Sequence, residues 1–69
     1  MLKINRLAEV LEEKKVSNRD IAKHVGKSEE TVSRWANNHR QPPLEDLHKI
    51  AKFLDVDIRD FLFSTKNSV

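Results

Sequence analysis

The chain contains a single glycine, Gly26, which separates two short segments with helical periodicity. Ser17 precedes the first segment and Ser28 precedes the second. Serine is a favoured N-cap because its hydroxyl accepts a hydrogen bond from a free backbone N–H of the first helical turn. Glycine is favoured just after a helix because it adopts a left-handed conformation without strain. These signals predict one helix from about residue 18 to 25 and a second from about 29 to 37, joined by a short turn.

The second of these helices is expected to have one apolar and one polar face. Its apolar side is formed by Val32, Trp35 and Ala36. The opposite side carries Glu29, Glu30, Ser33, Arg34 and Asn37. Donors and acceptors on short or forked side chains can read base edges in the major groove of DNA. A solvated outer face is the alternative, since amphipathic helices commonly have one, but the preceding helix and the turn favour a helix-turn-helix.

The remaining segments predict further helices and no strand. Helices are expected over residues 3–14, over 44–54 after the paired prolines, and over 58–63 after an Asp57 cap. The expected apolar stripes are Ile4, Leu7, Ala8, Val10 and Leu11 in the first of these, and Leu44, Leu47, Ile50, Ala51 and Leu54 in the second. Leu62 is expected to be the last core residue.

These elements together predict an all-α, compact five-helix domain over residues 1–63 with a flexible tail over residues 64–69. A chain of 69 residues buries only a modest core, so dimerisation is expected to help stabilise it. No apolar run reaches membrane length and the N-terminus lacks a signal-peptide core, which predicts a soluble, cytoplasmic protein with no membrane contact.

The composition argues against an enzyme or a metal site. The chain has no cysteine, no glycine-rich phosphate loop, and no acidic cluster with a histidine at usable spacing. The three histidines, His24, His39 and His48, have no spacing that places two on one helix face. We therefore expect no catalytic residue, no metal and no cofactor.

Positive charge is concentrated around the two central helices. Residues 14–40 hold seven basic and three acidic side chains, a net charge of +4, whereas residues 1–13 and 41–69 each carry a net charge of −1. Such a distribution suits a polyanionic partner, although it would also suit a solubilising surface.

The sequence resembles the phage repressor and Cro type (XRE-like) of helix-turn-helix DNA-binding proteins over roughly residues 3–63. The resemblance is carried by SNRDIAKHVGKSEETVSRWANN, the proline loop, LEDLHKIAKFLDV and IRDFL. It implies base-reading side chains at Ser28, Glu29, Glu30, Ser33 and Arg34. It implies phosphate-binding side chains at Asn18, Arg19, Lys27, Asn37, His39 and Arg40.

Two positions depart from the family pattern. The family usually has glutamine where this chain has Asn18, and glycine where it has Asn38. Asparagine keeps an amide donor at the first position, and it is the best non-glycine residue for a left-handed backbone at the second. Both departures are therefore compatible with the resemblance.

Individual roles within the implied site remain divided between two interpretations. Arg34 is expected to bind guanine, and a glutamate can accept a hydrogen bond from cytosine, so a G·C-containing half-site is expected. Glu29 and Glu30 would equally stabilise the positive end of the helix dipole. Trp35 could stack on a base, but its position beside Val32 favours packing in the core.

The function that these features favour is a small transcriptional repressor or regulator that binds an inverted-repeat operator in double-stranded DNA as a homodimer. Phe53 and Phe63 are possible dimer contacts, with the edge of the core as the alternative. Two other functions fit the residues: an antitoxin that binds a toxin partner and represses its own operon, and an interaction scaffold that has lost DNA binding.

Overall fold

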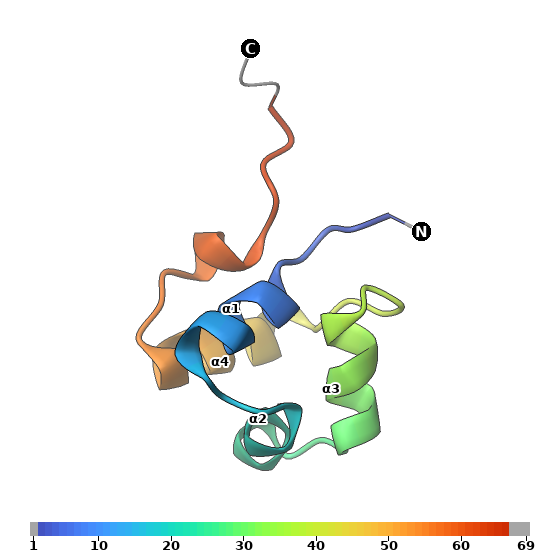
Figure 1. Cartoon of the computed structure of the whole chain (residues 1–69), viewed down its shortest axis with the longest axis vertical. Helices are drawn as coiled ribbons and strands as arrows, with labels where there is room; N and C mark the ends of the chain where they lie inside the picture. Colours follow the sequence, from blue (N-terminus) through green and yellow to red (C-terminus); the bar gives the residue numbers. More distant parts are fainter. Residues whose placement is uncertain (1, 67–69) are drawn as a thin grey trace.

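Four α-helices and one turn of 3-10 helix surround a single core in the computed structural model, which describes residues 2–66 (Figure 1). The helices are α1 (Leu7–Lys14), α2 (Asn18–Val25), α3 (Glu29–Ala36) and α4 (Leu44–Leu54), and the 3-10 turn is η1 (Ile58–Phe61). The all-α class is confirmed, but the fifth α-helix is replaced by η1. Of the expected tail, residues 67–69 lie outside the described residues.

The local signals around α2 and α3 have the predicted effect. The Ser17 hydroxyl accepts a hydrogen bond from the Asp20 N–H at 3.1 Å, and the Ser28 hydroxyl accepts one from the Thr31 N–H at 3.1 Å. Gly26 ends α2 with a φ of +72°. A β-carbon at Gly26 would meet no atom within 4 Å, so glycine is favoured there by its backbone conformation and not by lack of space.

The core lies where the four helices and η1 meet, and it differs from the expected one at its margins. Its members are Leu7, Val10, Leu11, Ile21, Ala22, Val25, Val32, Trp35, Leu47, Ile50, Ala51 and Phe61. Trp35 is buried, as predicted. Phe61, not Leu62, is the last core residue, because η1 turns with a period near three and points Phe61 inward.

Three side chains of the predicted stripes are exposed instead of buried. Leu44 is 74% exposed because it is the first residue of α4, and the buried positions of this helix begin only at its third residue. Ala8 is exposed on α1. Ile4 is 43% exposed because the chain is extended there and not helical.

The helix predicted over residues 3–14 begins only at Leu7. The preceding segment pairs with the end of the chain: the Arg6 N–H donates to the Phe61 carbonyl at 2.6 Å, and the Phe63 N–H donates to the Ile4 carbonyl at 3.1 Å. This pairing forms an isolated antiparallel bridge, the one strand-like feature among residues 2–66. Helical periodicity alone therefore predicts an α1 that is too long, because a local pattern cannot reveal that residues 4–6 pair with a segment more than fifty residues away.

The turn η1 is shorter than the helix predicted over residues 58–63, but its predicted cap is confirmed. The Asp57 carboxylate accepts a hydrogen bond from the Arg59 N–H at 2.9 Å. Hydrogen bonds from the Arg59 side chain and backbone lower the pKa of Asp57 to about 2.

A buried amide network connects the N-terminal segment to the loop after α3. Asn38 adopts a φ of +59°, the left-handed backbone expected at this position. Its Oδ1 accepts hydrogen bonds from the Ile4 and Asn5 N–H groups at 2.8 and 2.9 Å, and its Nδ2 donates to the Asn5 carbonyl at 3.0 Å. Asn38 thus supplies both the conformation of the family's glycine and a side chain that glycine lacks.

Asn5 completes this network, although no local sequence pattern marks it as a functional or structural residue. Its Nδ2 donates to the Trp35 carbonyl at 3.0 Å and to the Gln41 Oε1 at 2.7 Å. Its Oδ1 accepts from the Leu7 N–H at 3.0 Å and so satisfies the first free backbone N–H of α1, whose N-cap residue Arg6 makes no side-chain cap. Every buried side-chain nitrogen or oxygen among residues 2–66 has a hydrogen-bond partner, which is what makes burying these amides tolerable.

We predict that Asn38→Gly lowers the free energy of unfolding by about 1–3 kcal/mol, because glycine keeps the left-handed backbone but leaves buried N–H groups without an acceptor. Asn38→Ala should cost more, since alanine adds backbone strain. Urea unfolding followed by circular dichroism measures both. The exposed neighbour Asn37, changed to alanine, is the control and should stay within about 0.5 kcal/mol. An Asn38→Gly variant as stable as the parent would contradict this account.

Candidate nucleic-acid interface

The outer face of α3 presents most of the predicted base-reading side chains to solvent. Glu29, Glu30 and Arg34 are exposed, and Ser33 is half-buried. Ser28 is exposed, but its hydroxyl is already engaged with the Thr31 N–H at 3.1 Å and the Thr31 hydroxyl at 2.8 Å. The side chain of Ser28 therefore acts first as the helix cap.

Glu30 and Arg34 form an ion pair one helical turn apart on this face. Both side chains are more than half exposed, so the pair contributes only a few tenths of a kcal/mol to stability. Its effect is mainly on geometry, because it holds the Arg34 guanidinium against α3. An interaction this weak can be exchanged for another partner at small cost.

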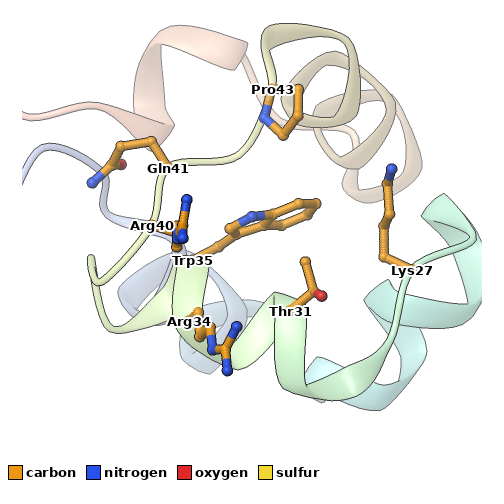
Figure 2. A pocket seen from close by; sticks show the side chains of 7 residues that line it. All are labelled: Lys27, Thr31, Arg34, Trp35, Arg40, Gln41 and Pro43. Atoms are coloured by element: carbon orange, nitrogen blue, oxygen red, sulfur yellow. The ribbon is translucent and has the colours of Figure 1, made fainter.

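A groove of about 410 Å³ lies beside this face, between α3, the turn before it and the loop after it (Figure 2). It is lined by Lys27, Thr31, Arg34, Trp35, Arg40, Gln41 and Pro43. In Figure 2 the Trp35 ring lies at the centre of the groove, between Lys27 on one side and Arg40 on the other. We call this the cationic groove, because three of its seven lining side chains are basic.

The loop after α3 folds back onto that helix and brings Arg40 to the cationic groove. The Arg34 carbonyl accepts hydrogen bonds from the His39 N–H at 3.0 Å and the Arg40 N–H at 3.3 Å. The backbone of Arg34 therefore positions Arg40, while its side chain lies on the outer face of α3. Asn37 and His39, two further predicted phosphate ligands, are exposed in the same loop.

Lys27 lies beside a carboxylate from a distant helix, Asp46. Asp46, in the first turn of α4, has a side chain only 8% exposed, and its Oδ2 lies 4.0 Å from the Lys27 ammonium. In the sequence, Asp46 is simply one of the acidic residues that contribute to the net charge of −1 over residues 41–69. Its spacing from Lys27 depends on how α4 packs against α2, which no local pattern reveals.

Other lining residues differ in how readily they could have been found. Thr31 precedes Arg34 by three positions and Trp35 by four, so helical spacing alone places it on their side of α3. Gln41 reaches the groove because Asn5 and Asn38 hold its side chain, with its Nε2 donating to the Asn38 Oδ1 at 3.2 Å. That arrangement has no sequence signal.

The other predicted contact residues lie outside the cationic groove. Asn18 and Arg19 begin α2, where Asn18 is half-buried and Arg19 is exposed. Phe53 stacks on His24 of α2, with ring centroids 4.2 Å apart. Phe63 instead lies beneath Lys3 and Arg6 of the N-terminal segment, each cationic group 6.0 Å from its ring centroid. The two phenylalanines thus pack against different parts of the molecule.

Residues 2–66 contain neither a metal-binding cluster nor a membrane-spanning helix. No group of three histidine, cysteine or acidic side chains is arranged to hold a metal ion. No helix in the described part of the chain is long and apolar enough to cross a membrane.

Comparison with known proteins places this architecture in a family. The helix-turn-helix family matches residues 7–61. A crystal structure of a candidate DNA-binding protein from Bacteroides fragilis has 47% sequence identity and a TM-score of 0.84, and the match covers 87% of this chain and 97% of that one. A crystal structure of a transcriptional regulator from Listeria innocua shares the fold, with a TM-score of 0.76 at 19% identity over 93% of this chain and 60% of that one.

A search of curated proteins gave no match. The family match nevertheless spans most of the chain and includes both capped helices and the glycine turn between them. The protein therefore belongs to the XRE-type helix-turn-helix family.

Proposed function

We propose that this protein binds double-stranded DNA sequence-specifically and regulates transcription, with α3 inserted into the major groove. The observation that carries the proposal is the position of the cationic groove directly beside the exposed polar face of α3. A B-DNA major groove admits one α-helix, and its walls are rows of phosphates. A helix flanked by basic side chains fits that geometry.

The cationic groove would bind the phosphate backbone. Lys27 and Arg40 supply positive charge from the turn before α3 and from the loop after it, and Gln41 and Thr31 supply neutral polar groups beside them. Phosphate contacts of this kind fix the register of a protein on the duplex but carry no sequence information. The exposed residues Asn37 and His39 extend the same contact along the loop.

Sequence would be read by Arg34 together with the glutamates of α3. An arginine makes two parallel hydrogen bonds to the O6 and N7 atoms of guanine, and a carboxylate accepts one from the N4 of cytosine. The ion pair between Arg34 and Glu30 places such a donor and such an acceptor side by side on the exposed face of α3. A half-site containing a G·C pair is the target that this pair of groups suits.

A homodimer acting as a repressor on an inverted repeat is the form of regulation we propose. A single α3 contacts only a few base pairs, and two copies related by a two-fold axis would read half-sites about one DNA turn, roughly 34 Å, apart. A bound dimer would then compete with other proteins for the same stretch of DNA.

We predict that Arg40→Ala weakens binding to all duplex sequences alike and lowers the slope of log affinity against log salt by about one, because one phosphate contact is lost. Fluorescence anisotropy with a selected and a scrambled duplex at several salt concentrations measures both effects. Arg59→Ala is the matched control, since it removes the same charge from η1, outside the cationic groove. Equal slopes for Arg40→Ala and the parent would remove Arg40 from the interface.

We predict that Arg34→Lys relaxes the preference for guanine at one position of each half-site by about 1–3 kcal/mol while largely preserving the salt slope. Lysine keeps the charge but cannot make the two parallel hydrogen bonds of a guanidinium. Selection from a random duplex pool, followed by sequencing, measures the preference for each variant. An unchanged preference would show that Arg34 contacts only phosphate.

A further inference from the structure

The outer side of α4 carries an apolar groove that is separate from the cationic groove. It has a volume of about 660 Å³ and is lined by Leu44, Glu45, His48, Lys49 and Ile58, which we call the Leu44 surface. Leu44, at 74% exposed, is its most prominent apolar side chain. Isolated exposed leucines are common, but Leu44 borders a hollow that has Ile58 on its wall and the charged residues Glu45 and Lys49 beside it.

The Leu44 surface continues onto the N- and C-terminal segments. Leu44 also lines a smaller groove of about 210 Å³, together with Ile4, Asn5, Gln41, Pro42, Leu47 and Leu62. Ile4 and Leu62 are both more than two-fifths exposed; Leu62 pairs with Asn5 in the antiparallel bridge, and Ile4 precedes Asn5. Leu44 therefore links two apolar grooves into one continuous surface.

The charges on the Leu44 surface are complementary to themselves. Glu45 and Lys49 are exposed one helical turn apart on α4, and neither takes part in an ion pair among residues 2–66. If two α4 helices meet antiparallel across a two-fold axis, Glu45 of each copy faces Lys49 of the other. A parallel arrangement would instead oppose like charges, which is unfavourable.

We infer that a second copy of this chain docks on the Leu44 surface through an antiparallel contact between the two α4 helices. Leu44 of each copy enters the other copy's groove beside Ile58, and reciprocal contacts between Glu45 and Lys49 set the register. Such a self-complementary patch is what a two-fold homodimer requires, because the same surface must serve both partners.

The two grooves can be occupied at the same time. No side chain lines both the Leu44 surface and the cationic groove, and the smaller groove beside Leu44 shares Gln41 but no basic side chain with the cationic groove. Docking of a second copy therefore leaves the basic side chains of the proposed DNA contact open. The Leu44 surface is small compared with stable interfaces, which use 20–30 residues from each partner. The dimer is therefore weak in solution and is completed on DNA, a consequence that rests on the proposed function.

Sedimentation velocity of the full chain, from about 10 μM to 1 mM without DNA, tests the contact independently of DNA binding. The expected result is a concentration-dependent monomer–dimer equilibrium that Leu44→Asp weakens at least tenfold. The change is compatible with folding, because Leu44 is exposed in the first turn of α4, where a carboxylate suits the helix dipole. Phe53→Asp, at the half-exposed aromatic on the side of α4 near α2, should leave the dimer intact.

Charge reversal distinguishes this geometry from any other. Glu45→Lys alone and Lys49→Glu alone should each weaken self-association, whereas the double variant, and an equimolar mixture of the two single variants, should restore it. Glu12→Lys and Lys14→Glu make the same changes of net charge on exposed positions of α1 and control for general electrostatics. Restoration is specific to a partner that carries the same surface.

Three results would overturn the proposal. A chain that stays monomeric up to 1 mM lacks this contact, as expected if the surface serves a different protein. Equal effects of the α4 and α1 reversals would show that only net charge matters. A dimer disrupted by Phe53→Asp and not by Leu44→Asp would place the contact elsewhere. Leu44→Asp should also keep the parent affinity for a single half-site, whereas a failure of all variants to bind DNA would count against the proposed function only.

Discussion

The left-handed backbone of Asn38 and the hydrogen bonds of its side chain hold together two segments that are distant in the sequence, the N-terminal segment and the loop after α3. The Oδ1 atom accepts from Ile4 and Asn5, 33 or 34 residues earlier, and from Gln41 in the proline loop. Because the Asn5 N–H is buried and the Ile4 N–H is partly buried, leaving either of them unpaired would cost more than the bond itself contributes. These hydrogen bonds therefore fix the first residues of the loop after α3. The same loop supplies Arg40, Gln41 and Pro43 to the wall of the cationic groove, so the shape of the groove depends on them.

Local chemistry explains which elements could be predicted from the sequence. Ser17, Ser28 and Gly26 act within a few residues of their own positions, so the bounds of α2 and α3 follow from short-range rules. The bounds of the N-terminal segment and of η1 do not follow from short-range rules, because the two segments pair with each other through the bridge between Asn5 and Leu62. Periodicity marked Ile4 as a helical core position, but pairing with the distant segment made it an extended, partly exposed one.

The candidate site divides along the same line. Helical spacing is enough to place Glu29, Glu30 and Arg34 together on one exposed face, because the geometry of an α-helix is independent of its surroundings. The cationic groove is a tertiary feature. Gln41 enters it through hydrogen bonds to the side chains of Asn5 and Asn38, and Asp46 reaches Lys27 through the packing of α4. A residue's charge could be read from the sequence, but its distance from other charges could not.

The acidic partners of the cationic groove bear on how selective the proposed DNA binding can be. Arg34 is paired with Glu30, and Lys27 lies 4.0 Å from the Asp46 carboxylate, whereas Arg40 enters no ion pair among the described residues. In a non-specific complex, a phosphate that approaches Arg34 or Lys27 must compete with a carboxylate already present, so each contact contributes less affinity than an unpaired cation would. Non-specific binding draws essentially all of its affinity from such contacts, whereas specific binding adds hydrogen bonds to bases. Because two of the three cations already have an acidic partner, the cationic groove has a slightly lower affinity for arbitrary DNA than three unpaired cations would give.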